Sequence, residues 1–313
     1  MFDIPILYIV FNRLDTVKRT FPKLKEIQPA ELYIAADGPR PSKEGEVENC
    51  KIVREYVTSH IDWNCNVHTL FREENLGCGK NVSAAITWFF DNVEMGIILE
   101  DDCLPDMSFF PYCRELLLKY KDEPRVMHIA GDNPVQWSKL KHHESYYFEP
   151  IQHCWGWANW ANRWKNYDFD INDNYKKVLE TNIYFKNPRT KEQWTNLLEQ
   201  MREHRIDTWD VQWSYKILEM GGLCINPRNN LIQNIGMNSG VHFEGNDSDA
   251  DGRPAIPMVF PLVHPKKLDF NYTEIKHLQN LGKDELPLII FIKNILKKLG
   301  VFYKLKKLIK GHI

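Results

Sequence analysis

Three consecutive acidic residues, Glu100, Asp101 and Asp102, directly follow the apolar run 97–99. Carboxylate oxygens are the ligands that Mg²⁺ and Mn²⁺ prefer, so the triplet indicates a divalent metal site. Because side chains alternate along a strand, we expect Glu100 and Asp102 to share one side and Asp101 to face the other. Only one or two carboxylates could then bind one ion, and a diphosphate ligand would complete its shell. The alternative is a solvated strand end with helix-capping acids.

Two further stretches could contact a phosphate. Arg13 follows the first apolar run, where its guanidinium could bind a phosphate or a base, or simply face solvent. The segment NLGCGKN (75–81) precedes a predicted helix, and its backbone amides, with Lys80 nearby, could face a phosphate. It lacks the P-loop spacing, so a turn that caps the helix is the alternative.

The elements that must position these residues alternate between strands and helices. Apolar runs without polar alternation, separated by helical patterns, are typical of a mostly parallel sheet covered on both faces. This is an α/β fold of Rossmann-like type. We expect strands at 4–11, 31–37, 67–73, 96–102 and 126–132, and helices at 15–27, 43–60, 79–92 and 107–121.

Polar residues follow several of these predicted strands. They are Arg13 after the first strand, Asp37 after the second, the acidic triplet after the fourth, and Asp132 with Asn133 after the fifth. Ligands of parallel sheets bind where the carboxyl ends of the strands meet. We therefore expect these side chains to converge at one edge of the sheet.

The second half of the chain is less regular. We expect helices at 191–203 and 209–220 and short strands at 223–227 and 231–236, followed by a loop at 237–254 rich in Gly, Asn and Asp. The segment 153–164 is rich in tryptophan and is predicted to be partly helical. The spacing of Trp160 and Trp164 favours core packing, whereas Trp155 and Trp157 could equally stack on a sugar.

The ordered motifs resemble those of a glycosyltransferase with the GT-A fold, and more narrowly the N-acetylglucosaminyltransferase I family. EDD (100–102) resembles a DxD-type metal motif, and the sequence that follows it to residue 126 resembles the family's Pro-Asp-Phe-Phe helix. CWGWANWANRW (154–164), WDVQW (209–213), CINP (224–227) and GVHF (240–243) resemble later segments. The resemblance covers roughly residues 4–245. NLGCGKN also resembles a segment common in inverting family 2 enzymes.

The resemblance implies a role for each matching residue. Asp102 would hold Mn²⁺ or Mg²⁺, and Asp210 would be the general base of an inverting transfer. The remaining donor-binding set would be Arg13 and Asp37 at the nucleotide base, Asp101 at the ribose, Glu100 at the transferred sugar, and Trp209 beside that sugar. His242 could touch the diphosphate or metal from the loop at 237–254, or be a bystander there. Trp155 and Trp157 are the candidates for acceptor binding.

Asp207 is the alternative base, although it could instead cap a helix that begins near it. Asp210 is followed by Val211, where the family has a second acid. The acceptor-binding part of the family is not recognisable, so the acceptor is not implied.

Composition limits the function classes. The 313 residues carry a net charge of −2, which does not favour a nucleic-acid binder. Seven cysteines without CxxC spacing indicate reduced thiols and a cytoplasmic setting. The N-terminal apolar run is short and lacks the features of a signal peptide, so we expect it to be a core strand.

The C-terminal residues 287–313 carry seven lysines and no acid, and without them the chain has 33 basic and 42 acidic residues. Apolar residues from Leu288 to Leu299 line one face of a predicted helix. This pattern resembles an amphipathic helix on an anionic membrane, contacting it through residues 287–310. Docking on the acidic body is the alternative. We expect a GT-A domain at 1–265 and a C-terminal extension at 266–313.

These features predict a metal-dependent inverting glycosyltransferase that moves a sugar from a nucleotide-diphosphate donor to a glycan or lipid-linked glycan. The resemblance alone implies UDP-N-acetylglucosamine as the first expectation for the donor. We expect it at the inner face of the cell membrane, in polysaccharide biosynthesis. One alternative is a sugar-1-phosphate nucleotidyltransferase, but the segment after the first strand, FNRLDTVKRT, has no glycine. The other is a non-catalytic sugar-binding protein, which would not need Asp210.

Overall fold

The structure is a computed structural model that describes residues 1–134, 143–236 and 253–270. Met1–Phe270 form one compact unit. The predicted tail helix and His242 lie outside the described residues, and the predicted domain boundary at 265 stays a prediction. Within the described residues, no helix combines the length and the apolar character needed to cross a bilayer.

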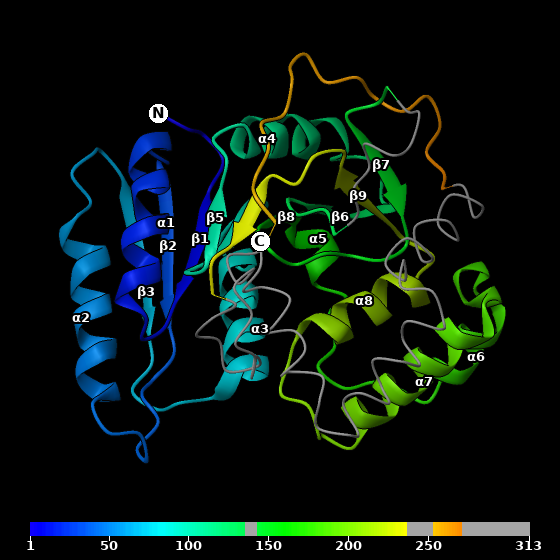
Figure 1. The fold of residues 1–313 in the computed structure, drawn as a ribbon, viewed down its shortest axis with the longest axis horizontal. Helices are drawn as coiled ribbons and strands as arrows, with labels where there is room; N and C mark the ends of the chain where they lie inside the picture. The colour runs from blue at the N-terminus through cyan, green and yellow to red at the C-terminus, as the bar shows by residue number, and fades with distance from the viewer. Residues whose placement is uncertain (135–142, 237–252, 271–313) are drawn as a thin grey trace, which may run out of the picture. The chain divides into compact units, whose positions relative to one another are not determined.

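A mixed sheet of eight strands forms the centre of this unit, in the order β3–β2–β1–β4–β8–β6–β9–β7 (Figure 1). Six strands run parallel to one another, and β7 and β8 run antiparallel to their neighbours. The predicted α/β class with a mostly parallel sheet is therefore confirmed. The strands are β1 (Ile6–Val10), β2 (Glu31–Ala36), β3 (Asn66–Phe71), β4 (Met95–Glu100), β6 (Val126–Ala130), β7 (Tyr146–Glu149), β8 (Trp157–Trp160) and β9 (Leu223–Pro227).

Helices cover both faces of the sheet because alternate strand residues face opposite sides. Tyr8 packs into one core with residues of α1, α2 and α4, whereas Leu7 and Ile9 pack into the other with residues of α3 and α8. The helices are α1 (Leu14–Ile27), α2 (Glu46–Ser59), α3 (Gly77–Phe90), α4 (Phe109–Lys119), α5 (Ala161–Trp164), α6 (Tyr175–Thr181), α7 (Pro188–Arg202) and α8 (Asp210–Glu219), with a 3₁₀ helix, η2 (Ile183–Lys186). All six helices predicted from the sequence are present, with shifts of a few residues at their ends.

A small second sheet pairs β5 (Cys103–Pro105) with β10 (Ile232–Asn234) in antiparallel orientation. Its hydrogen bonds bring the chain after β9 back to the acidic triplet, and Ile235 N donates to the carbonyl of Asp102 at 2.9 Å. The strands predicted at 223–227 and 231–236 are confirmed as β9 and β10. By contrast, β5, β7 and β8 were not predicted.

Candidate functional site

The carboxyl ends of β1, β2, β4 and β6 meet at one edge of the sheet, as the sequence predicts. β1 is the central strand of this group, pairing with β2 on one side and β4 on the other. The register aligns Ile9 with Glu100 and Val10 with Ala36, so Arg13, Asp37 and the triplet all emerge at the same end.

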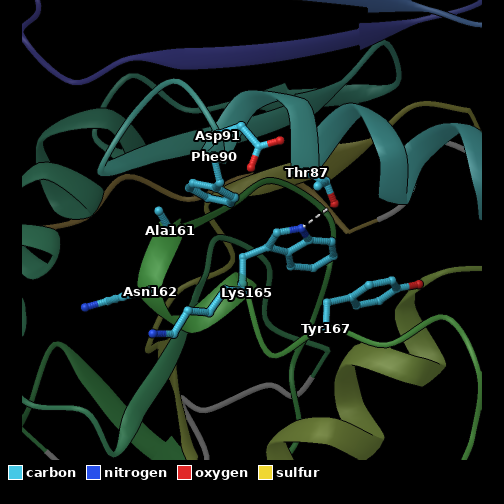
Figure 2. Close-up of a pocket in the computed structure, with 8 residues that line it drawn as sticks. Thr87, Phe90, Asp91, Ala161, Asn162, Lys165 and Tyr167 are labelled. Atoms are coloured by element: carbon cyan, nitrogen blue, oxygen red, sulfur yellow. Dashed lines mark hydrogen bonds between the residues drawn. The ribbon is translucent and has the colours of Figure 1, made fainter.

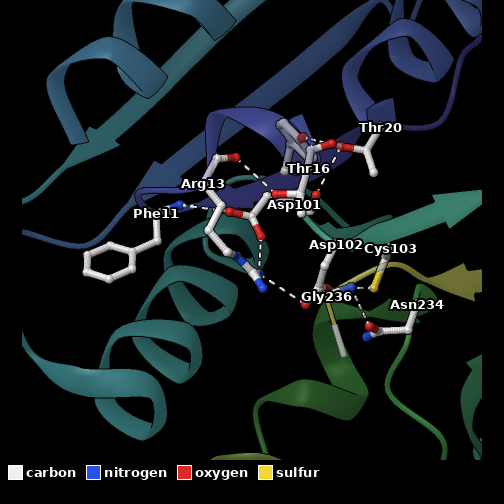
Figure 3. Close-up of polar contacts among 10 residues, drawn as sticks. Phe11, Arg13, Thr16, Thr20, Asp101, Asp102, Cys103, Asn234 and Gly236 are labelled. Carbon is white, nitrogen blue, oxygen red and sulfur yellow. Dashed lines mark hydrogen bonds and ion pairs between the residues drawn. The ribbon is translucent and has the colours of Figure 1, made fainter. Parts of the chain in front are cut away.

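Arg13 joins the two aspartates of the triplet (Figure 3). Its Nη2 donates to Oδ1 of Asp101 and, at 3.0 Å, to Oδ2 of Asp102. Asp101 Oδ2 also accepts from Phe11 N at 3.3 Å. The expected strand alternation was wrong here: β4 ends at Glu100, and the chain turns through Asp101 and Asp102, so both carboxylates face one guanidinium.

Asp101 and Asp102 share one guanidinium partner, Arg13, and Glu100 lies next to them in the chain. Burial, the largest cause, and the charges of Asp102 and Asp101 together raise the pKa of Glu100 to about 8. Burial also raises the pKa of Asp101 to about 6, against the opposing effect of Arg13. A cation bound beside the triplet would therefore be favoured electrostatically.

Two aspartates pair with Arg13, and of these Asp102 is the one that can reach a ligand. Its side chain is 17% exposed, whereas that of Asp101 is only 4% exposed. A methyl group at Gly236 would lie 2.3 Å from Asp102 Oδ2, so the backbone passes closely over this carboxylate. The described residues contain no group of three or more His, Cys, Asp or Glu side chains arranged around a metal position. These residues fit an ion that takes one protein carboxylate and completes its shell with ligand oxygens.

Asp210, the predicted base, is the first residue of α8. Its Oδ1 accepts from the Thr208 hydroxyl, and its carbonyl accepts from Gln152 Nε2 at 3.2 Å. Its charge adds to the causes that raise the pKa of Glu100, which puts the two carboxylates within electrostatic reach. The side chain is half-buried and stands at a helix N-terminus, where negative charge is stabilised.

Asp207, the alternative base, caps α3. Its two oxygens accept from Cys78 N at 2.9 Å and from Gly79 N at 2.8 Å. The expectation that it would cap the helix starting near residue 207 was wrong, because it reaches across to a helix 128 residues earlier. A carboxylate that accepts two amide hydrogen bonds is less available to take a proton from a substrate.

Asp37 binds the preceding part of the same helix start. Its carboxylate accepts from Leu76 N at 3.0 Å, Gly77 N at 3.1 Å and Asn75 Nδ2 at 3.0 Å. Burial raises the pKa of Asp37, and the amide hydrogen bonds oppose this effect. A donor contact of Asp37 stays a prediction, but its oxygens already fix the 75–77 turn.

The first amides of α3 are thus all occupied by the two carboxylates, and no phosphate is needed to satisfy them. The expectation that these amides face a phosphate is therefore not supported, and the turn-capping alternative describes them. Lys80, in the next position, is exposed. Its contact with a donor stays a prediction.

Two of the predicted sugar-contacting tryptophans are core residues. Trp157 is 0% exposed in β8, between β4 and β6. Trp209 is 3% exposed and stacks on Trp157, with ring centroids 5.5 Å apart and planes 20° apart. Neither indole has a face open to a sugar, so the assignments of Trp157 to the acceptor and Trp209 to the donor sugar are corrected to core packing.

Trp155 keeps a partly exposed ring and remains a candidate for the acceptor. Its backbone N donates to Asp132 Oδ1 at 3.2 Å, and the Arg253 guanidinium lies 5.8 Å from its ring centroid. Trp155 therefore stands between the residue that follows β6 and the chain segment that begins at residue 253.

The sequence did not predict a polar cluster beside Trp155. His153 Nε2 lies 3.1 Å from Oε1 of Glu149, and Asn226 donates to the same oxygen. Burial opposes protonation of His153, but Glu149 and Asp132 raise its pKa. Of this cluster, only Asp132 could be noticed in the sequence, because it follows a predicted strand. No sequence pattern singled out Glu149 or His153.

A separate cavity of about 350 Å³ lies between the C-terminal end of α3 and α5 (Figure 2). Trp164 Nε1 donates to Thr87 Oγ1 at 3.0 Å in its wall, and Tyr167 stacks on Trp164 with centroids 4.3 Å apart. The Tyr167 hydroxyl donates to the carbonyl of Trp209 at 3.2 Å. None of the residues predicted from the sequence to form the site lines this cavity. Its lining residues are Thr87, Phe90, Asp91, Ala161, Asn162, Trp164, Lys165 and Tyr167.

Comparison with known proteins finds no matching family model and no matching curated protein. Among solved structures, the chain is similar to GalNAc-T7 with UDP, GalNAc and Mn²⁺, at a TM-score of 0.42 and 14% identity, over 72% of this chain and 42% of that one. Mouse xyloside xylosyltransferase 1 matches at a TM-score of 0.37 and 11% identity, over 70% and 82% of the two chains.

A third similar structure is S. aureus TarS 1-349, at a TM-score of 0.35 and 11% identity, over 53% of this chain and 49% of that one. This chain thus spans less than half the length of the GalNAc-T7 chain that it matches. Likenesses at this level do not identify a family or an activity for this chain.

Proposed function

We propose that this protein is a metal-dependent, inverting glycosyltransferase that uses a nucleotide-diphosphate sugar. One observation supports the proposal: the acidic triplet, with its partly exposed Asp102, follows β4 at the carboxyl edge of a mostly parallel sheet, and the charge of the base candidate Asp210 acts on Glu100 of that triplet. The first need of such a reaction is a cation for the diphosphate, and the second is a base for the acceptor.

On the donor side, Asp102 would hold Mn²⁺ or Mg²⁺, and the donor's phosphate oxygens would complete the shell. The bound ion would supply positive charge to the leaving diphosphate. Arg13 pairs with the same two aspartates. It would contact the donor's nucleotide when a cation takes its place at Asp102. Glu100 and Asp101 would contact the transferred sugar and the ribose.

On the acceptor side, Asp210 would take the proton of the attacking hydroxyl. The acceptor oxygen forms its bond to the anomeric carbon as the bond to the diphosphate oxygen breaks, so configuration inverts in one displacement. The Thr208 hydroxyl orients the Asp210 carboxylate by donating to one oxygen and leaves the other for the acceptor. Trp155 would pack against the acceptor glycan.

The finer assignments are a UDP-sugar, with UDP-N-acetylglucosamine first, and a glycan or lipid-linked glycan acceptor in polysaccharide assembly. We place the enzyme in the cytoplasm, at the inner face of the cell membrane. These assignments rest on the motif resemblance and on the composition of the chain, including the basic tail.

A melting experiment tests the proposal. We would measure Tm with UDP-, GDP-, CMP- and dTDP-sugars, each with and without Mn²⁺, on the wild type, Asp102→Ala and the exposed control Asp91→Ala. Ligand at a hundredfold excess over Kd stabilises by about 2.7 kcal/mol, which is about 4 °C in a chain of this size.

We expect one nucleotide class to raise Tm in the presence of Mn²⁺, in the wild type and in Asp91→Ala but not in Asp102→Ala. A response to none of the four classes would contradict the proposal. Release of pyrophosphate from a nucleoside triphosphate and a sugar phosphate would instead indicate a nucleotidyltransferase.

A further inference from the structure

Residues 255–263, which we name the apolar strap, run as an extended segment over the outside of the compact unit. Figure 1 shows the segment that contains it, in orange, passing over α4 and β7. Met258 N donates to Ser108 Oγ at 2.8 Å, and Val263 exchanges hydrogen bonds with Ser145 through N at 2.9 Å and O at 2.8 Å. The strap is therefore fixed to the body at its middle and at its C-terminal end.

Only part of the strap's apolar surface is buried in the core. Met258 and Leu262 are 7% and 6% exposed and belong to the core that contains α4. The other large side chains face outward, with exposures of 50% for Ile256, 76% for Val259, 39% for Phe260 and 51% for Val263. A cluster of exposed apolar side chains on a fixed backbone indicates a contact surface.

The charge next to this surface is opposite to that of most of the chain. Residues 253–270 contain three basic residues, Arg253, Lys266 and Lys267, and one acidic residue, Asp269, whereas residues 1–286 as a whole carry 33 basic and 42 acidic residues. Lys266 and Lys267 are exposed. The surface thus combines protruding apolar side chains with a basic flank, which complements an anionic partner.

We propose that the apolar strap docks on an anionic lipid bilayer. Apolar side chains enter the boundary between headgroups and acyl chains, while nearby lysines contact anionic lipid phosphates. A stable protein–protein interface takes roughly 800 Å² from each partner, which is more than a nine-residue strap presents by itself. A bilayer needs no complementary concave surface, and the side chains of the strap protrude.

Docking at the strap would place the candidate site beside the bilayer. Asn230 Nδ2 donates to the carbonyl of Arg253 at 2.9 Å, just before the strap, and the Arg253 guanidinium lies over the Trp155 ring. The chain therefore passes from the acceptor side of the site directly to the docking surface.

Vesicle flotation with the full chain tests this inference. The probes are vesicles of phosphatidylcholine alone and of phosphatidylcholine with phosphatidylglycerol. The strap variant combines Val259→Ser, Phe260→Ser and Val263→Ser. The matched control combines Val47→Ser, Val67→Ser and Met220→Ser, which removes three apolar side chains of similar exposure elsewhere. A charge variant carries Lys266→Glu and Lys267→Glu.

We expect the wild type and the control to float with the anionic vesicles, the strap variant to bind at least about tenfold more weakly, and the charge variant to lose the preference for anionic lipid. Equal flotation of the strap variant and the wild type would overturn the inference, as would a wild type that binds neither vesicle. A Tm lowered only in the strap variant would show that the chain itself covers the strap. Donor-induced Tm shifts on the same samples report the proposed function separately.

Discussion

Asp207 and Asp210 lie three residues apart, yet their surroundings give them different tasks. Asp207 holds two backbone amides of α3, and Asp210 holds one side-chain hydroxyl at the start of α8. A carboxylate engaged by amides stabilises the fold, whereas one oriented by a single hydroxyl keeps an oxygen for a proton. The sequence alone left both open as the base.

We predict that Asp210→Asn lowers the rate of sugar transfer by about 10²–10⁴-fold, because an amide cannot accept the acceptor proton. Donor-induced Tm shifts should persist. Asp207→Asn should keep most of the transfer rate, and because asparagine keeps one accepting oxygen it should lose less unfolding free energy than the about 0.5–2 kcal/mol that removal of a helix cap costs. Steady-state transfer and urea unfolding of both variants check this, and a slower Asp207→Asn than Asp210→Asn would reverse the assignment.

Arg13 occupies the carboxylate that we assign to the metal. We predict that Arg13→Gln is destabilised by about 3–5 kcal/mol without metal, because partly buried carboxylates lose their partner. Mn²⁺ should then raise its Tm more than it raises that of the wild type. Arg114→Gln, which removes an exposed pair with Asp3, is the control and should respond to Mn²⁺ like the wild type. If Mn²⁺ raised the Tm of all three proteins equally, Arg13 would not compete with a metal ion for Asp102.

His128 is fully buried and neutral. Its Nε2 donates to the His153 carbonyl at 2.9 Å, its Nδ1 accepts from Trp213 Nε1 at 3.3 Å, and burial lowers its pKa to about 3. Between pH 6.5 and 3 the unfolded chain binds a proton that the folded chain does not, so stability falls as pH falls.

We predict that this group removes about 2 kcal/mol of unfolding free energy between pH 7 and pH 5. Urea unfolding of the wild type and His128→Gln at both pH values measures the difference. The variant should lose less stability over this range. Identical losses would show that His128 does not titrate as described.

At the scale of elements, Gly156 makes the entry into β8. It has φ +61°, its carbonyl accepts from Gly131 N at 2.7 Å, and a methyl group there would lie 2.7 Å from Ile232 Cδ1. Gly221 has nearly the same φ, +63°, but nothing within 4 Å of a methyl group. Substitutions at the two glycines can therefore distinguish the cost of backbone strain from the cost of overpacking.

We predict that Gly221→Ala costs about 1–2 kcal/mol, from the left-handed backbone alone. Gly156→Ala should cost more, since it adds overpacking of typically about 1–3 kcal/mol. Urea unfolding of the two variants checks this order. Equal costs would mean that Ile232 moves aside freely.

Most of the parallel strands could be predicted because they are apolar runs of strand length between helical patterns, although β3 (NVHTLF) is largely exposed. β8 could not, because Trp157, Trp160 and Trp164 follow a spacing of three and four that fits a helix. Its strand conformation is imposed by β4 and β6, with which it pairs on both sides. This pairing depends on distant parts of the chain, so the residues of β8 alone do not predict a strand.

The same limit applies to the site. Arg13 and the triplet could be predicted to converge, because the residues after neighbouring parallel strands emerge together. The roles of Asp37 and Asp207 as caps of α3 depend on contacts 40 and 128 residues apart. No local pattern signals them, and the burial of Trp157 and Trp209 likewise depends on tertiary packing.

For the whole molecule, the distribution of charge relates the proposed chemistry to the membrane. An excess of acid in residues 1–286 contrasts with the basic flank of the apolar strap and with the seven lysines of residues 287–313. Membrane contact through residues 287–310 stays a prediction, since they lie outside the described residues. The strap is a second proposed contact, and vesicle binding by the strap variant distinguishes it from contact through residues 287–310.

The most direct measurement is an anomalous difference map from crystals grown with UDP and Mn²⁺. We predict a manganese peak about 2.0–2.2 Å from a carboxylate oxygen of Asp102, bridged to the diphosphate, with Arg13 moved off that oxygen. UDP bound with Arg13 still paired to Asp102 and no manganese peak at that carboxylate would contradict the proposed metal-dependent transfer.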